Sequence, residues 1–163
     1  MTASFTHRPA TEADEPFLRA LFLQARPELG LLPEPVRDQI VGMQLAAQRQ
    51  QYLRTAPGSV DEILEVTEDG RPAPAGRVWR HRTPECHRLL DLAIRADRRR
   101  RGLGSAVLRW LCAEAAADGT TLGLSVRHDN PGARELYLRH GFTIAGETSD
   151  YAELQWSAES NHE

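Results

Sequence analysis

The sequence predicts an α/β fold, a mixed α+β sheet of about seven strands flanked by about four helices. Three observations lead to this prediction. Strand-like and helix-like segments alternate along the 163 residues, and no linker, internal repeat or low-complexity segment divides them. A glycine-containing turn over residues 99–105 joins an apolar run to a helix-like segment. A chain of this length suffices for one proper core, so we expect a single domain over residues 1–163.

The N-terminal third predicts one strand and two helices. We expect a strand over residues 3–9 and a helix that begins at Thr11, because apolar side chains then recur at helical spacing. Three prolines and a glycine predict a loop over residues 26–35. A second helix is expected over residues 36–54. Its apolar stripe is expected to consist of Val36, Ile40, Met43 and Ala47, and its polar side of Gln44, Gln48 and Gln51.

The remaining elements alternate in the same way. A turn over residues 68–72 separates strand-like runs at 61–66 and 76–81, which is typical of a hairpin or meander, and the run 89–94 continues that sheet. The helix expected next, over residues 104–118, is apolar over much of its circumference, which indicates burial beyond the sheet, for example at a subunit interface. The last expected elements are a strand over 121–127, a helix over 131–140 and strands over 142–148 and 151–156.

The turn Arg99-Arg100-Arg101-Gly102-Leu103-Gly104-Ser105 is the most informative stretch of the chain. The N–H groups of a first helical turn have no internal partner and carry partial positive charge, so a turn that opens a helix can hold phosphate. A Walker loop would need Lys after the last glycine, and a dinucleotide fingerprint would need a third glycine where this chain has Val107. The pattern that remains is Arg/Gln-x-x-Gly-x-Gly/Ala, matched by Arg99, Gly102 and Gly104.

A second segment, Asn130-Pro131-Gly132-Ala133-Arg134-Glu135-Leu136-Tyr137-Leu138-Arg139-His140-Gly141-Phe142, predicts a short capped helix. Asn130 suits the N-cap, Pro131 the first helical position, and Gly141 the left-handed residue after the end. The two motifs, in this order and separated by a helix and a strand, resemble those of the GCN5-related N-acetyltransferases, the GNAT family. The resemblance covers residues 61–157 well and the N-terminal third in outline.

The resemblance implies the GNAT fold and direct transfer of an acetyl group from acetyl-CoA, as co-substrate, to a primary amine of a small molecule or protein. In the family, backbone N–H groups of the strand before the turn meet the acyl carbonyl and the pantetheine arm, and the turn meets the pyrophosphate. No metal is implied. The acceptor site is usually shaped by the first two helices and the last strands, here residues 26–52 and 148–151, which carry no diagnostic motif. The implied cofactor-binding residues are Leu92, Ala93, Ile94, Arg99, Arg100, Arg101, Gly102, Gly104, Ser105 and Asn130.

The resemblance also implies two catalytic residues. Tyr137 lies where the family commonly places a tyrosine that protonates the CoA thiolate, although core packing also explains an aromatic side chain on the apolar face of a short helix. Asp91 lies where several members carry an acidic residue that acts as general base through water, and strand alternation places it on the face opposite to Leu92. Five other side chains stay open as alternatives for the base. They are His87, His128, His140, Glu147 and Glu153.

Composition argues against several other classes. A net charge of −3 and a pI near 6.1 disfavour a general nucleic-acid binder, despite the arginines at 98–101. The two cysteines, Cys86 and Cys112, are too few for a disulfide framework and lack metal-ligand spacing. No apolar run approaches the roughly 18–20 residues that span a bilayer, and the N-terminus lacks a signal-peptide pattern, so we expect a cytoplasmic protein with no membrane partner.

Two other classes of function stay open. One is a non-catalytic acyl-CoA-binding or sensor module on the same fold. The other is a nucleic-acid-binding protein that uses Arg95 and residues 98–101, which would show steep salt dependence. Members of the family often form dimers, so a homodimer is an alternative to a monomer.

Overall fold

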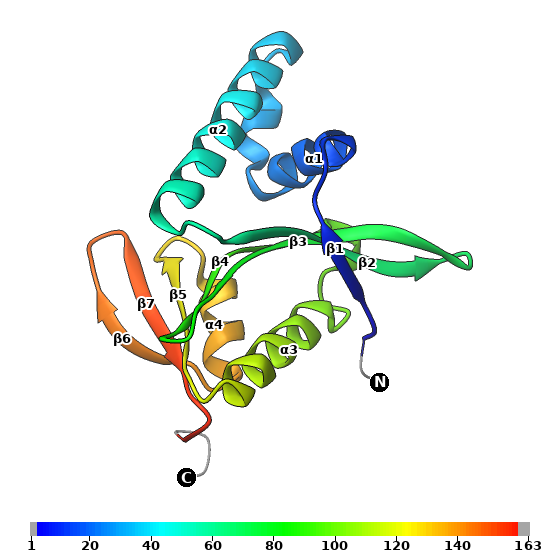
Figure 1. Cartoon of the computed structure of the whole chain (residues 1–163). Coiled ribbons are helices and arrows are strands. Elements are labelled where there is room, and N and C mark those ends of the chain that lie inside the picture. Colours follow the sequence, from blue (N-terminus) through cyan, green and yellow to red (C-terminus); the bar gives the residue numbers. More distant parts are fainter. Residues whose placement is uncertain (1–2, 160–163) are drawn as a thin grey trace.

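The computed structural model describes residues 3–159, which form one seven-stranded sheet with helices on both faces (Figure 1). The strand order is β1-β2-β3-β4-β5-β7-β6, mixed in direction, which confirms the predicted fold class. The strands are β1 (Thr6–Pro9), β2 (Val60–Glu68), β3 (Arg71–Arg82), β4 (His87–Ile94), β5 (Leu122–Arg127), β6 (Thr143–Glu147) and β7 (Tyr151–Trp156). The α-helices of the described residues are α1 (Glu15–Ala25), α2 (Glu34–Thr55), α3 (Leu103–Ala117) and α4 (Pro131–Arg139), with 3₁₀ turns at Glu12–Asp14, Pro27–Leu31 and Ala96–Arg98.

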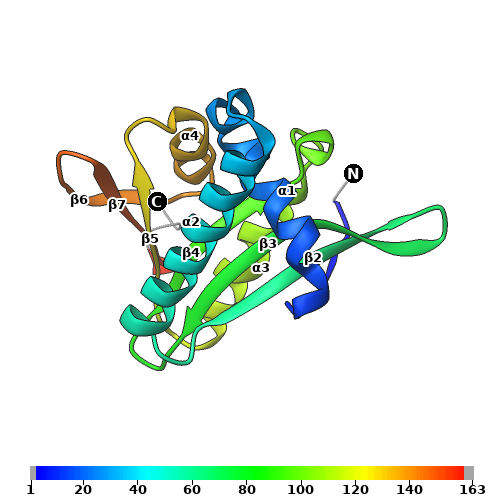
Figure 2. The same cartoon turned by 90° about the horizontal axis from the view of Figure 1, so that it is seen from above.

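The helices divide into two layers. Helices α1 and α2 cover one face of the sheet and α3 and α4 the other, as the two views agree (Figure 1 and Figure 2). The main core lies between the sheet and the α3–α4 layer, where branched and aromatic side chains exclude water. Its largest members include Leu64, Val78, Val107, Leu108, Leu111, Leu122, Leu124, Tyr137, Phe142 and Leu154.

The sheet opens between its two central strands. Strands β4 and β5 run parallel, but their pairing begins at His87↔Leu122 and ends at Leu89↔Leu124. Beyond that pair, β4 continues to Ile94 beside β3, and β5 continues to Arg127 beside β7. The two strands therefore no longer pair beyond Leu89 and Leu124, and we refer to this break in the sheet as the opening.

Helix α2 differs most from its prediction. It begins at Glu34, and three residues of its expected apolar stripe are exposed: Val36 by 45%, Met43 by 65%, and Ala47. Of its expected polar side, Gln44 and Gln51 are exposed, whereas Gln48 is partly buried and accepts a 3.2 Å hydrogen bond from Arg77 Nη1 of the sheet. The reason is that the sheet surface below α2 is itself charged. No helix in the described part of the chain, including the 22 residues of α2, is apolar enough to cross a membrane.

The broad apolar surface of α3 is covered within this chain. The buried side chains of the helix are Leu103, Ala106, Val107, Leu108, Leu111, Cys112 and Ala115. They pack against β-strand residues and against α4, so burial within the chain accounts for much of the apolar surface of the helix.

Candidate active site

The free edge of β4 is the first component of the site. Residues Leu92–Ile94 pair with β3 on one side, and on the other side they lie beyond the last pair with β5, at Leu89. The strands β3 and β4 approach closely because β3 has Gly76 here, where a Cβ would lie 2.5 Å from the carbonyl oxygen of Ala93. Backbone groups of β4 that point into the opening lack a strand partner and are positioned to bind an extended ligand.

The turn that follows β4 is the second component. Arg100 and Gly102 both have left-handed backbones, with φ of +60° and +84°, and α3 begins at Leu103. A glycine at position 102 avoids the cost that a side chain would add in this conformation. Gly104 lies in the first turn of α3, where a Cβ would make an ordinary 3.5 Å contact with Leu136. The unpaired N–H groups of this turn, next to the opening, form an anion-binding arrangement.

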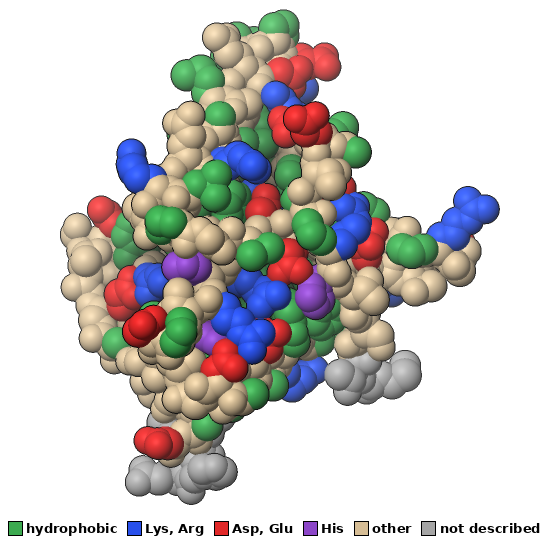
Figure 3. Space-filling model, in the orientation of Figure 1, with side chains coloured by type: hydrophobic (Ala, Val, Ile, Leu, Met, Phe, Trp, Pro, Cys, Tyr) green, Lys and Arg blue, Asp and Glu red, His purple; other side chains and the backbone are tan. Residues whose placement is uncertain are grey.

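The arginines around this turn do not form one basic patch. Arg95 and Arg98 both bind the carboxylate of Glu68 on the β2–β3 hairpin, the second at 2.6 Å, and Arg95 also pairs with Asp97 at 2.5 Å. These guanidinium groups hold the pKa of Glu68 below its usual range. Acidic and basic side chains are also interspersed on the face shown in Figure 3. The arrangement argues against a polyanion-binding surface at Arg95 and Arg98.

The three arginines of the motif have other roles. Arg99 Nε donates a 3.1 Å hydrogen bond to the carbonyl oxygen of Ile94 and so fixes the turn to the end of β4. All three side chains, including Arg100 and Arg101, are exposed. Arg100 and Arg101 therefore keep exposed guanidinium groups that take no part in fixing the turn.

Asp91 lies on the α1–α2 face of β4, whereas Leu92 packs into the core on the other face, which confirms the predicted alternation. Burial raises the pKa of Asp91, and the guanidinium of Arg77, 4.0 Å away, opposes this rise. That guanidinium is already paired with Asp61, at 2.7 and 2.9 Å, and with Gln48. The Asp91 side chain is 28% exposed, so its carboxylate is partly desolvated and only partly compensated, as suits a proton acceptor.

Tyr137 lies in the opposite layer, on α4. Its ring packs on Phe142 with 5.7 Å between centroids, and only 8% of the residue is exposed. Burial and the charge of Asp91 raise the pKa of Tyr137 well above its usual value, so its phenol stays protonated. The hydrogen bonds of the described residues include none to this hydroxyl. At the start of the same helix, Asn130 accepts a 3.3 Å hydrogen bond from the N–H of Ala133, which confirms the predicted cap.

Ser105, a predicted cofactor-binding residue, has a partner within the protein. Its hydroxyl lies 2.9 Å from Nε2 of His140, which connects the first turn of α3 to the end of α4. Burial and the neighbouring charges of Arg109 and Arg139 lower the pKa of His140. The hydroxyl of Ser105 therefore holds the two helices together, and its N–H group remains part of the helix N-terminus.

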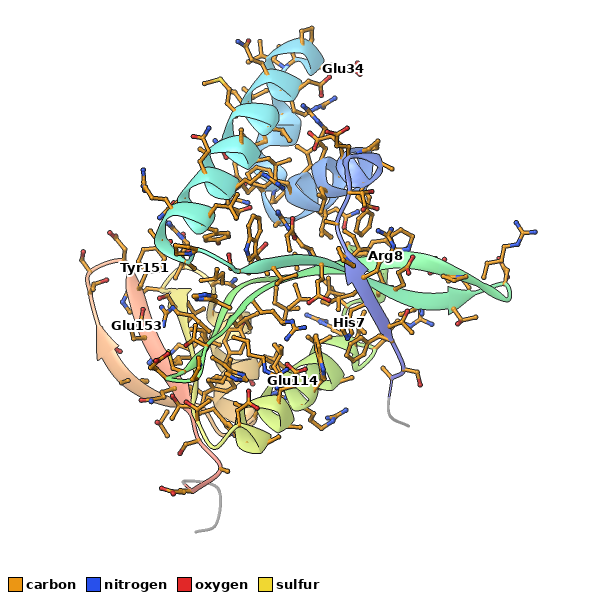
Figure 4. All side chains as sticks on the ribbon, viewed as in Figure 1. His7, Arg8, Glu34, Glu114, Tyr151 and Glu153 are labelled. Carbon is orange, nitrogen blue, oxygen red and sulfur yellow. The ribbon has the colours of Figure 1, made fainter. Side chains whose placement is uncertain are left out.

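The other candidates for the general base are also engaged. The imidazole of His140 is held by Ser105, and the remaining contacts are His87 with Asp118, His128 with the carbonyl of Thr148, Glu147 with Arg134, and Glu153 with Arg88 and Ser125. Figure 4 shows Glu153 within β7. These contacts favour Asp91 over the alternatives.

Sequence reasoning missed the polar cluster around Asp91. The sequence pattern does not predict an ion pair between Asp61 and Arg77. It places Gln48 on the polar side of α2 and indicates no role for Tyr52. Tyr52 donates a 3.0 Å hydrogen bond to the carbonyl oxygen of Leu90. The one available signal was the presence of charged residues inside strands, at positions 61 and 77, where a buried charge requires a partner.

Comparisons with known proteins agree with this architecture. The sequence pattern described as the acetyltransferase (GNAT) family matches residues 6–142. An acetyltransferase from Thermus thermophilus is 23% identical, with a TM-score of 0.66 over 96% of this chain and 97% of that one. A PaiA N-acetyltransferase from Thermoplasma acidophilum, solved in complex with coenzyme A, is 13% identical, with a TM-score of 0.64 over 94% and 99% of the two chains.

A third structure, a GNAT family acetyltransferase from Elizabethkingia anophelis with acetyl-CoA bound, is 16% identical, with a TM-score of 0.60 over 94% of this chain and 97% of that one. No curated protein sequence matches this chain. The likeness to these structures extends over nearly the whole of each chain.

Proposed function

Because this chain belongs to the GNAT family of acetyltransferases, we propose that it transfers an acetyl group from acetyl-CoA to a primary amine of a small molecule or a protein. The observation that carries the proposal is the opening between β4 and β5, which has a partly desolvated carboxylate, Asp91, on one side and a protonated phenol, Tyr137, on the other.

The residues around the opening fit acetyl-CoA. The free edge of Leu92–Ile94 can bind the amide-rich pantetheine arm through backbone hydrogen bonds. The turn from Arg99 to Ser105 can bind the pyrophosphate through the N–H groups of α3 and the exposed guanidinium groups of Arg100 and Arg101. The side chain of Asn130 caps α4, so its proposed contribution is to fix the position of the first turn of that helix. Bound acetyl-CoA supplies the thioester on which the residues below act.

The two proposed catalytic groups divide the proton transfers between them. Asp91, acting directly or through water, takes a proton from the incoming ammonium group, and the free amine then attacks the thioester carbon. A C–N bond forms and the C–S bond breaks, and the nitrogen, which is cationic after the attack, releases its second proton to solvent. Tyr137 donates its proton to the departing thiolate and regains one from solvent. Because a phenol is a weaker acid than a thiol, with reference pKa values of about 10 and about 8.5, its position close to the thiolate must favour this transfer.

The acceptor amine is proposed to enter from the α1–α2 side. The segment from Arg26 to Tyr52 borders Asp91 there, and the charge of Arg26 acts on that carboxylate. Tyr151, exposed by 41% at the start of β7, lies under the guanidinium of Arg127, whose carbon is 5.7 Å from the ring centroid (Figure 4). On the proposed path of the amine, Arg26 and Arg127 are positively charged and Asp91 is negatively charged. This combination is compatible with a small amine or an exposed amino group of a protein.

The first test is calorimetric titration of the purified protein with acetyl-CoA, beside the Gly104→Glu variant. The added side chain places negative charge in the proposed pyrophosphate site, while its Cβ makes only an ordinary contact with Leu136. We expect saturable binding by the wild type and its loss in a variant that still shows a cooperative thermal transition. Thiol release with a panel of amines then distinguishes an enzyme from a non-catalytic binding module. A wild type that does not bind acetyl-CoA would refute the proposal.

A further inference from the structure

We propose that Tyr52 of α2 is a positioning residue for acetyl transfer, because its hydroxyl holds the backbone of β4 at the point where the pairing with β3 is interrupted by a bulge and the pairing with β5 has ended. The inference rests on the proposed function. It adds a role for a residue that need not touch either substrate.

The contact lies at a β-bulge. Trp79 of β3 pairs with Asp91, whereas the next residue, Arg80, pairs with Leu89, so Leu90 has no partner on β3. Leu89 is also the last residue of β4 that pairs with β5. Leu90 is therefore unpaired on both sides, although β4 resumes its pairing with β3 at Asp91. A bulge of this kind bends a strand and redirects the side chains that follow.

The hydroxyl of Tyr52 fixes the backbone at this point. It donates to the carbonyl oxygen of Leu90 at 3.0 Å, across 38 residues of sequence. That carbonyl belongs to the same planar peptide group as the N–H of Asp91, so the bond orients the unit that leads into the proposed base and the free edge. Without Tyr52, the carbonyl would need another donor or would rotate.

Tyr52 is itself held in one position. Its ring meets Trp79 edge-on, with 5.1 Å between centroids, and the indole N–H of Trp79 donates to Ser59 Oγ at 2.9 Å. Burial and the charge of Asp91 raise the pKa of Tyr52 to about 12, so it remains a donor at any pH at which the protein would be assayed. The Tyr52 hydroxyl thereby connects α2, which lies on the side where the amine is proposed to enter, to β4, the strand that is proposed to hold the acyl group.

The experiment uses Tyr52→Phe, which removes the hydroxyl and keeps the ring on Trp79. Its matched control is Thr55→Val, which removes another hydroxyl of α2 that donates to a carbonyl, that of Gln51 at 2.8 Å, without contacting β4. Three quantities are compared with the wild type: the Kd for acetyl-CoA, the Kd for adenosine 3′,5′-bisphosphate, and kcat with the best amine found. The nucleotide lacks the pantetheine arm, so it reports on the turn after β4 and not on the edge of the strand.

For Tyr52→Phe, we expect the Kd for acetyl-CoA to rise and kcat to fall, with kcat/KM reduced about tenfold, while the Kd for the nucleotide stays unchanged. Thr55→Val should match the wild type in all three. Unchanged acetyl-CoA binding and kcat in Tyr52→Phe would overturn the proposal, and so would an equal loss for both ligands, since that would indicate general damage to the fold. A wild type that fails to bind acetyl-CoA would instead refute the proposed function itself.

Discussion

Removing the negative charge of Asp61 should both destabilise the protein and change the proposed base. Asp61 and Arg77 form a bidentate ion pair, and their side chains are only 9% and 7% exposed. Asp61→Asn keeps the volume and leaves Arg77 with the amide of Gln48 and with Asp91 at 4.0 Å. Breaking a buried pair from one side costs about 3–5 kcal/mol, and the two remaining contacts of Arg77 favour the lower end, about 3 kcal/mol.

For a domain of this size, that loss lowers Tm by roughly 6–12 °C, since each kcal/mol shifts it by about 2–4 °C. Differential scanning fluorimetry and urea titration measure the effect. The matched control is Glu15→Gln, the same carboxylate-to-amide change in an exposed helical pair, where Glu15 is 56% and Arg19 37% exposed. The control should change stability by no more than about 0.5 kcal/mol.

The same variant tests the proposed base through its pH dependence. The charge of Asp61 raises the pKa of Asp91, and the charge of Arg77 lowers it. Asp61→Asn removes the first effect and also frees Arg77 from its ion pair, so both changes lower the pKa of Asp91. A base acts in its deprotonated form, so the acid limb of kcat/KM should move to lower pH. Two results would refute this reasoning: a variant as stable as the wild type, or an acid limb that stays in place or moves to higher pH.

Two further predictions concern Tyr137 and the N-terminal ion pair. Tyr137→Phe should lower kcat about 10²-fold and leave the Kd for acetyl-CoA unchanged, because the ring still packs on Phe142, and full turnover in stopped-flow thiol release would exclude it as the acid. Asp14 accepts hydrogen bonds from Arg8 at 2.9 and 2.8 Å and from the N–H of Thr11 at 2.8 Å, which lower its pKa from 3.8 to about 2. A lowered pKa stabilises the fold above 3.8, and the benefit is lost as pH falls towards 2. Asp14→Asn should therefore lower the free energy of unfolding by about 2 kcal/mol at pH 7, as measured by urea titration. The difference from the wild type should shrink towards pH 2. A difference that does not depend on pH would contradict this assignment.

The features that sequence reasoning predicted well are those set by local chemistry. The turn before α3 and the end of α4 were identified from glycines, and the structure gives Gly102 and Gly141 the left-handed φ values of +84° and +90°. Asn130 caps its helix as its side chain predicts. Strand geometry predicts Asp91 and Leu92 on opposite faces, because successive strand residues point to opposite sides, and in the structure Leu92 packs against the core.

The features that it missed depend on contacts distant in sequence. The bond between Tyr52 and Leu90 joins residues 38 positions apart, and the pair of Asp61 and Arg77 depends on how two strands align. For α2, the apolar stripe predicts burial for Met43, which is exposed, whereas the sheet surface below that helix carries the Asp61–Arg77 pair, which Gln48 contacts. Helix periodicity describes a single element, whereas the face that is buried depends on what the neighbouring element presents.

The opening in the sheet bears on how the two proposed proton-transfer groups, which lie on opposite layers, would serve one reaction centre. In a continuous sheet, the backbone would separate the α1–α2 layer, which borders Asp91, from the layer that carries Tyr137. Here β4 and β5 stop pairing at Leu89, and burial, together with the charge of Asp91, raises the pKa of Tyr137. Acetyl transfer needs a proton removed where the amine arrives and a proton supplied where the thiolate leaves. A ligand held along the free edge of β4 would be reached from one face by the proposed base and from the other by the proposed acid, and the bulge at Leu90 lies where that separation begins.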